Sequence, residues 1–401
     1  MASLKIKFRA SSMNGKRGIL YFQIIHKRVV RQITTRHKIL ESEWNNTTDT
    51  IIIDSQSSRY NHLIEIRNYL NTDIRRLRSI IINFDSQGID YSSDDIVTEY
   101  FNKLDRLSFI GALIRNINQL KLLGKVRTSE TYTATLKSFK QFLGNGDILF
   151  DVIDSNTMLQ YEAYLKNKRL SMNTISFYMR ILRAVYNRGI EEGITDNKNP
   201  FKHVYTGIDK TIKRAITAKE IKIIKDLNFT ADKPLDLARD LFLFSFYTRG
   251  MSFVDMSYLK KGNLINGVLS YRRKKTGQQL FIKWEKCMQD IVEKYQNVCG
   301  ENYLLPIITN PYLDHRKQYL NALSYTNKKL KRIAQLSGLN VTLTMYVARH
   351  SWASIAKQNR IPISIISEGM GHDSESTTQI YLASLDSSAV DRANHIILKL
   401  I

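Results

Sequence analysis

The period of the hydrophobic residues changes along the chain, and this change limits the fold more than any other feature of the sequence. In residues 1–40, bulky apolar side chains such as Leu4 and Ile6 alternate with polar and charged ones. A period of two is typical of strands with one buried face, and Gly15 and Gly18 interrupt the alternation where turns are needed. We therefore predict a small antiparallel sheet at the start of the chain.

The following residues, up to about position 190, have a helical period instead. Residues 57–84 carry apolar side chains three or four positions apart, from Leu63 to Ile81, and predict one long helix. The polar stretch 85–94 contains a glycine and predicts a connection. Four more helices are expected beyond it: around 110–120, from an N-cap at Ser129 to 143, at 156–166 and at 173–189.

A third region follows a break in the chain. Pro200 disfavours helix in the residue before it, and the polar stretch up to Arg214 predicts a linker. Thr217, with Glu220 three residues later, predicts the start of a capped helix. We therefore expect a multidomain, mostly α protein. Its three modules are a small β-rich module with a helix at 1–95, a helical module at 105–200, and a mixed α+β module at 214–401.

The charge of the chain indicates the class of its partner. The sequence has 60 Lys and Arg residues against 37 Asp and Glu residues, which gives a net charge of +23 at pH 7. A fold does not need such an excess, whereas binding to a polyanion such as nucleic acid does. Residues 1–40 contain ten basic residues and no acid, so the predicted sheet would have a basic face able to lie in a DNA groove. The alternatives are a basic surface without a partner and an anionic membrane surface, although no basic amphipathic anchor helix stands out.

The sequence favours an intracellular protein without a membrane span, a disulfide framework or a cofactor. No apolar run approaches the roughly 20 residues of a membrane span, and the N-terminus lacks a signal-peptide core. Cys287 and Cys299 stand outside any metal-ligand spacing. The chain has no phosphate-binding Gly-x-x-x-x-Gly-Lys loop, and its carboxylates form no metal-binding cluster; Asp373 and Glu375 would be the nearest false lead.

The residues that indicate chemistry gather in the last third of the chain. Arg349 and His350 are adjacent in an apolar helical segment. Gly371-His372 stands at the next predicted helix boundary, and Tyr381 follows nine residues after that histidine. A single tyrosine among 21 is usually a packing residue, so only the combination is informative.

This combination resembles the tyrosine recombinase (phage integrase) family. The C-terminal signature of that family is His-x-x-Arg-His, then Leu-Gly-His, then a tyrosine nine residues further on. The resemblance implies that Tyr381 is the nucleophile and that Arg349, His350 and His372 act on the phosphate. Tyr346 stands where the family usually has a histidine, and it either takes over that role by hydrogen bonding or simply packs.

The resemblance also extends upstream. Residues 270–278 alternate and turn like a β-hairpin, and they resemble the hairpin that carries the family's catalytic lysine, which puts Lys275 in that role. The family's first arginine is missing, because Ser252 occupies its position. Arg249 precedes Ser252 by three residues, so its long side chain is a candidate for the same phosphate, and Arg239 is a second candidate.

The expected chemistry explains these residue types. Attack on a DNA phosphodiester requires a deprotonated phenol and a neutralised transition state, and guanidinium groups stay charged while binding oxygens bidentately. A lysine can protonate the leaving 5′ oxygen, and imidazoles can hold or move protons. A covalent 3′-phosphotyrosine retains the bond energy for rejoining, so neither ATP nor a metal is expected.

The resemblance implies a site-specific recombinase or integrase, similar to a subgroup from Bacteroides-type mobile elements. Its first module would bind arm-site DNA, its second would be a SAM-like core-binding domain, and its third would be catalytic. The expected partner is double-stranded DNA, on which four copies assemble at paired sites, with accessory DNA-bending proteins, in the bacterial cytoplasm at the nucleoid. The basic residues expected to contact DNA are Arg17, Arg28, Arg31, Lys213, Arg214 and Arg273.

A second function remains open at this stage. The absent first arginine and the tyrosine in place of a histidine would also suit a degenerate recombinase, used as a DNA-binding regulator or excision factor. The presence of Tyr381, Arg349, His372 and Lys275 favours the enzyme.

Overall fold

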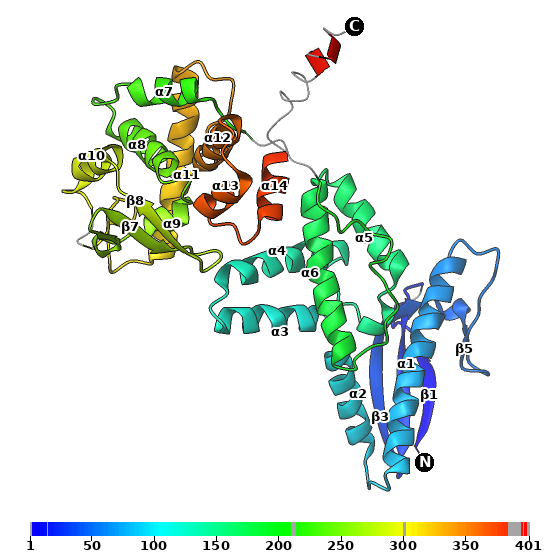
Figure 1. Cartoon of the computed structure of the whole chain (residues 1–401). Coiled ribbons are helices and arrows are strands. Elements are labelled where there is room, and N and C mark those ends of the chain that lie inside the picture. Colours follow the sequence, from blue (N-terminus) through cyan, green and yellow to red (C-terminus); the bar gives the residue numbers. More distant parts are fainter. Residues whose placement is uncertain are drawn as a thin grey trace. The chain divides into compact units, whose positions relative to one another are not determined.

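The computed structural model describes residues 2–13, 15–209, 214–299, 302–383, 394–395 and 397–398. The chain divides into two compact units, Met1–Asp209 and Lys210–Ile401. The described part of each is mostly helical, as Figure 1 shows. Among the described helices, none is both long and apolar enough to cross a bilayer.

The first unit begins with the predicted three-stranded antiparallel sheet. Strands β1 (Ser3–Arg9), β2 (Gly18–His26) and β3 (Val29–Ile39) pair in chain order. The long helix α1 (Tyr60–Ser86) lies along this sheet (Figure 1) and confirms the helix expected over 57–84. Alternate apolar residues of β2 and one stripe of α1 form a common core: Leu20, Phe22, Ile24, Leu63, Ile66 and Leu70. Between β3 and α1 lie a 3-10 turn (Glu41–Glu43) and the short pair β4 (Trp44–Asn45) and β5 (Thr50–Ile51).

The next helix, α2 (Ser93–Leu107), was not expected from the sequence. Its N-cap is Ser92, which exchanges hydrogen bonds with Asp95 in a capping box. Ile96 and Tyr100 then join the core of the sheet and α1. The stretch predicted as a connection over 85–94 is therefore shorter, because α1 continues to Ser86 and α2 begins at Ser93.

A helical bundle completes the first unit. It consists of α3 (Phe109–Leu122), α4 (Val126–Phe142), a 3-10 turn (Phe150–Val152), α5 (Ser155–Asn167) and α6 (Met172–Glu191). All four predicted helices are present, but Ser129 is not an N-cap. Ser129 is buried inside α4, where its hydroxyl donates to the Val126 carbonyl, because α4 starts four residues earlier than predicted.

The stretch from residue 201 to residue 209 packs on this bundle, although it was predicted to be linker. Phe201 and Val204 are buried in the bundle core. The Ser176 hydroxyl donates to the Gly207 carbonyl at 2.6 Å. The Asn173 side chain both donates to the Asp209 carbonyl and accepts from its N–H, at 2.9 Å each. The chain is therefore held on α6 up to residue 209.

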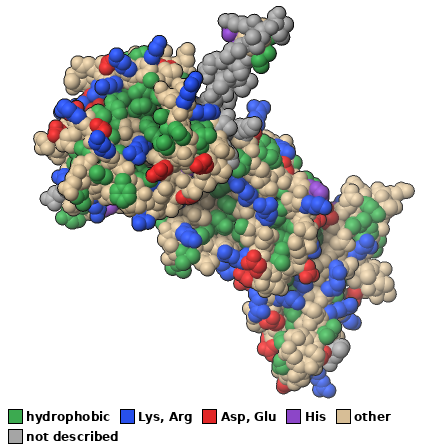
Figure 2. Space-filling view, in the orientation of Figure 1, with side chains coloured by type: hydrophobic (Ala, Val, Ile, Leu, Met, Phe, Trp, Pro, Cys, Tyr) green, Lys and Arg blue, Asp and Glu red, His purple; other side chains and the backbone are tan. Residues whose placement is uncertain are grey.

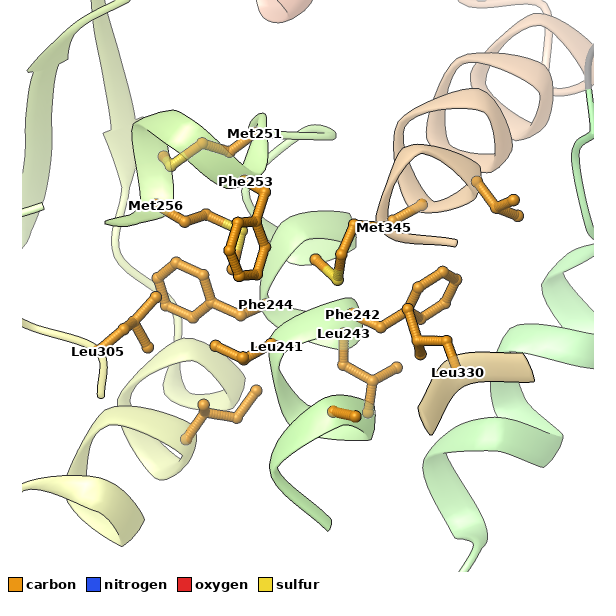
Figure 3. Packing of buried hydrophobic residues seen from close by; sticks show 14 of the residues in the cluster. Leu241, Phe242, Leu243, Phe244, Met251, Phe253, Met256, Leu305, Leu330 and Met345 are labelled. Carbon is orange, nitrogen blue, oxygen red and sulfur yellow. The ribbon is translucent and has the colours of Figure 1, made fainter. Parts of the chain in front are cut away.

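The second unit is built around helix α8 (Lys233–Tyr247), which is apolar on most of its faces. Figure 3 shows Leu241, Phe242, Leu243 and Phe244 pointing to different neighbours, among them Met345 and Leu330. A helix that is apolar all round is buried on all sides. The surrounding helices are α7 (Ala218–Asp226), α9 (Phe253–Ser257), α10 (Lys286–Tyr295), α11 (His315–Leu336), α12 (Met345–Gln358), α13 (Ile363–Met370) and α14 (Glu375–Ala383).

A small sheet lies beside these helices. It contains β6 (Leu264–Ile265), β7 (Val268–Arg272) and β8 (Gln279–Lys283), paired antiparallel in chain order. Strands β7 and β8 and their turn confirm the hairpin predicted around residues 270–278. The capping box predicted at Thr217 is also present, at the start of α7. The mostly α fold class, with its small N-terminal sheet and mixed last part, is confirmed.

Candidate active site

Helix α12 carries Arg349 into the interior of the second unit. Arg349 is only 5% exposed. One of its terminal nitrogens donates to the Gly250 carbonyl at 2.8 Å, and the other donates to the Met370 carbonyl at 2.7 Å. These acceptors are neutral main-chain groups, and they fix the position of the guanidinium. The helix itself is held by Ser351, whose hydroxyl accepts from the Ile216 N–H at 2.9 Å.

Two glycines make room for the basic side chains. Gly250 has φ +74°, and a Cβ there would lie 2.6 Å from the Arg349 Cα. Gly371 ends α13 in the left-handed conformation, with φ +63°, and a Cβ there would lie 2.7 Å from the Arg273 Cδ. At both positions a side chain would be strained and would also displace an arginine.

His372 lies next to Arg349. Its Nε2 is 3.1 Å from an Arg349 nitrogen, and its Nδ1 is 2.8 Å from the Thr378 hydroxyl. Burial, followed by the positive charges of Arg349, Arg273 and Lys275, lowers the pKa of His372 to about 4. The imidazole is therefore neutral at pH 7.

Arg273 lies in the same place, although it was expected on a DNA-contacting surface. It is 7% exposed, and it donates to the Gly371 carbonyl. Its Nε is 3.9 Å from a carboxylate oxygen of buried Asp255. That same oxygen accepts from the Ser252 hydroxyl at 2.6 Å. A buried guanidinium therefore shares a carboxylate with Ser252, the residue that stands where the family has its first arginine.

The two sequence candidates for that arginine have different surroundings. Arg249 is half-buried with φ +62°, and its Cδ would lie 3.6 Å from a Cβ at Gly369, the residue before Met370. Arg239 instead pairs with Asp236 and Asp240 and donates to the Leu227 carbonyl. The acids around Arg239 already neutralise its charge.

Lys275 lies in the turn between β7 and β8 and is exposed, yet close enough to His372 to lower its pKa. His350 is 5% exposed, and the ring of Tyr346 meets it edge-on with centroids 4.5 Å apart. Tyr346 itself is 54% exposed. The helical position of Tyr381 is in α14, and its side chain lies outside what the structure describes.

The remaining predicted DNA contacts that the structure describes are exposed residues. Arg17 and Arg28 are exposed, and Arg31 is exposed and paired with Asp94 at 2.6 Å. Arg214 is exposed, and Lys213 lies outside the described residues.

Sequence reasoning did not foresee two parts of this site. One is the buried place of Arg273, which depends on a contact with Gly371 that no local sequence signal indicates. The other is Thr378, a fully buried residue of α14 whose hydroxyl contacts His372. Its neighbour Thr377 is exposed, and its hydroxyl contacts the Ser374 hydroxyl of the same segment.

Comparisons with known proteins agree with this arrangement. The family model of the phage integrase SAM-like domain matches residues 108–207, and that of the phage integrase family matches residues 215–388. The chain is 28% identical to tyrosine recombinase XerA of Pyrococcus furiosus over 245 residues, which is 59% of this chain and 79% of that protein.

Solved structures show the same fold. A lambda integrase tetramer bound to a Holliday junction has a TM-score of 0.54 and 15% identity, covering 90% of this chain and 92% of that one. The Tn1549 transposon integrase in complex with a circular intermediate DNA has a TM-score of 0.53 and 16% identity, covering 73% of this chain and 99% of that one.

These findings define an enzyme that breaks and rejoins DNA strands. The chain belongs to the phage integrase family of tyrosine recombinases. It is a tyrosine-type site-specific DNA recombinase. The similarity to a Bacteroides-type subgroup stays a prediction.

Proposed function

We propose that Tyr381 attacks a DNA phosphate that is bound by two guanidinium groups, those of Arg349 and Arg273. One observation supports this most. Arg349 donates to the Met370 carbonyl and Arg273 donates to the Gly371 carbonyl, so both guanidinium groups lie next to His372, which also contacts Arg349. In the proposed step, the phenolate oxygen bonds to phosphorus and the bond to the 5′ oxygen breaks. A 3′-phosphotyrosine and a free 5′ hydroxyl result, and the reverse attack rejoins the strand.

The other site residues have proton-handling and supporting roles in this proposal. Lys275 gives a proton to the leaving 5′ oxygen, and an imidazole of the site accepts the proton of the phenol. His350 supports the phosphate contacts from α12, with the Tyr346 ring against its edge. The site brings the positive charges of Arg349, Arg273 and Lys275 close to His372, which suits a transition state with added negative charge.

Arg273 is the preferred substitute for the absent arginine. Ser252 and Arg273 are joined through one oxygen of Asp255, so the guanidinium lies beside the position that the family's arginine would occupy. The other Asp255 oxygen accepts from the Lys274 N–H at 2.8 Å, which orients the carboxylate and the start of the hairpin turn together. Arg249 remains the alternative, since it lies within the same turn as Gly250.

The wider assembly is also part of the proposal. Three modules at 1–95, 105–200 and 214–401 would bind arm DNA, bind core DNA and cleave it, the first two lying in one compact unit. The protein binds DNA and works as a multimer, and we infer four copies on paired sites, by analogy with the tetrameric lambda integrase. Basic side chains lie on both units in the face shown in Figure 2, as expected for proteins that follow a DNA backbone. We also propose accessory DNA-bending proteins as partners and a location at the bacterial nucleoid.

The test compares the two arginines on a nicked suicide duplex that contains the recombination site. Arg273→Ala should slow formation of the covalent complex by about 10²- to 10³-fold, the usual effect of removing one transition-state contact. Ser252→Arg should restore part of the rate in that background, because it returns a guanidinium to the same place. If Arg249→Ala abolishes the reaction while Arg273→Ala does not, Arg249 is the phosphate ligand.

The same assay separates the enzyme from the degenerate DNA-binding regulator. The wild-type protein should give a protein–DNA band that survives denaturation. Binding without any such band would support the regulator.

A further inference from the structure

Thr378 is the one fully buried hydroxyl of α14 whose surroundings are described, and it bonds to a group of the active site. It is 0% exposed, and its Oγ1 lies 2.8 Å from the His372 Nδ1. Helix α14 also carries Tyr381, three residues later and thus nearly one turn further along. A hydrogen bond therefore links the helix of the nucleophile to the imidazole beside Arg349.

The direction of this hydrogen bond follows from the chemistry of its neighbours. An arginine can only donate, so the His372 Nε2, 3.1 Å from Arg349, must accept. At pH 7 the imidazole carries one proton, which must then be on Nδ1. The Thr378 hydroxyl therefore accepts a hydrogen bond from the Nδ1–H group, which is the one donor of the neutral ring.

From this geometry we propose that Thr378 is a positioning residue of the recombination reaction. It holds His372 in the Nδ1–H tautomer, with Nε2 directed at Arg349, and it fixes α14 against the ring. The proposal rests on the function proposed above for Arg349, His372 and Tyr381.

The charged groups around His372 make its tautomer important. Arg349 on α12, together with Arg273 and Lys275 from the hairpin, opposes protonation, and Asp373 favours it. Burial, together with these cations, keeps the ring neutral through the physiological range, and its tautomer then decides whether Nε2 donates or accepts. If the ring rotated or changed tautomer, two donors would face each other at Arg349.

The competing explanation is that Thr378 only fills space between α14 and α13. Valine has the shape of threonine with a methyl group in place of the hydroxyl, so it separates the two explanations. Filling space requires the shape alone, whereas positioning requires the oxygen.

The experiment uses the full-length protein with Thr378→Val, Thr378→Ser and Thr377→Val. Thr377→Val is the matched control, since it removes an exposed hydroxyl from the adjacent position of the same helix. The rate of covalent complex formation is measured at saturating suicide duplex over pH 5–9, together with DNA affinity and thermal unfolding. The tautomer of His372 is measured from the ¹⁵N shifts of its two ring nitrogens in histidine-labelled protein, assigned with His372→Asn.

We expect Thr378→Val to slow the covalent step by roughly ten- to a hundred-fold, the effect of leaving a buried donor without its acceptor. DNA affinity should be unchanged, and the ¹⁵N shifts should lose the pure Nδ1–H pattern. Thr378→Ser should restore both the rate and the pattern, and Thr377→Val should match the wild type.

Wild-type rate and tautomer in Thr378→Val would overturn the proposal. If the valine variant fails to fold, Thr378→Ala against Thr378→Ser makes the same comparison. Failure of the proposed function looks different: the wild type would then form no covalent complex, while the ¹⁵N shifts would still report whether Thr378 sets the tautomer.

Discussion

The two units of this protein hold their basic residues in different ways. On the sheet of the first unit they are exposed or half-buried, and several pair with acids: Lys7 with Asp49, Lys27 with Asp90, and Arg31 with Asp94. In the second unit, Arg349 and Arg273 are buried, and their hydrogen bonds run mainly to main-chain carbonyls.

The difference indicates what each surface can do. An exposed cation contributes modestly and is screened by salt, so affinity for DNA must come from many such groups together. A buried guanidinium attracts an approaching anion strongly, because water screens its charge little there. One such group has a large effect on a reaction. Changes in the second unit should therefore affect chemistry, and changes on the sheet should affect binding and its salt dependence.

Tyr381→Phe should give the largest effect. It removes only the attacking oxygen, so the covalent complex should disappear while DNA affinity and its salt dependence stay at wild-type values. The measurement is denaturing electrophoresis on a suicide duplex beside a binding titration. Covalent product from the phenylalanine variant would mean that another residue is the nucleophile.

Lys275→Ala should have a smaller effect that depends on the substrate. Loss of a general acid typically costs about 10²- to 10⁴-fold in rate, but a leaving group that needs no proton avoids this cost. A duplex with sulfur in place of the 5′ leaving oxygen should thus be cleaved at a rate close to that of the wild type. Equal losses on the oxygen and sulfur substrates would contradict the acid role.

Neutralising exposed cations of the sheet should give the smallest effect on rate. Lys5, Arg28 and Lys38 changed to glutamine should lower the log–log salt slope of binding to long DNA by up to about 2.7, or about 0.9 per phosphate contact. Cleavage of a short core site should be unaffected. Lys27→Gln with Arg31→Gln is the comparison, and it should change the slope less per residue, because Asp90 and Asp94 already compensate those charges. An unchanged slope in both sets would make the sheet a solvated basic surface.

Local sequence signals predicted much of this fold. The alternation in residues 1–40, the hairpin that carries Lys275 and the capping box at Thr217 each depend on neighbouring residues, and each is present. Helix α2 was missed although its sequence carries helix signals. Ser92 and Asp95 form a capping box, and Ile96, Tyr100 and Leu104 recur at helical spacing. This segment is stable as a helix because Ile96 and Tyr100 pack on α1, a contact that is distant in sequence.

The active site also combines parts that the sequence predicted with parts that it did not predict. The motif around Arg349, His372 and Tyr381 was recognisable from spacing alone. The burial of Arg273 was not, because it depends on how the hairpin turn meets Gly371, almost a hundred residues later. Thr378 and Thr377 are identical in type and adjacent, so only the packing of α14 distinguishes the buried hydroxyl from the exposed one.

The segment that connects the two units is anchored at both ends, which limits the distance between the two anchored residues. Asp209 is held on α6 by Asn173, and Ile216 is held on α12 by Ser351, which leaves six residues between them. Seven peptide steps span at most about 25 Å. If the first unit binds DNA as proposed, a tether this short would hold the second unit near that DNA at an effective concentration on the order of millimolar. Cleavage would then begin from an almost intramolecular encounter.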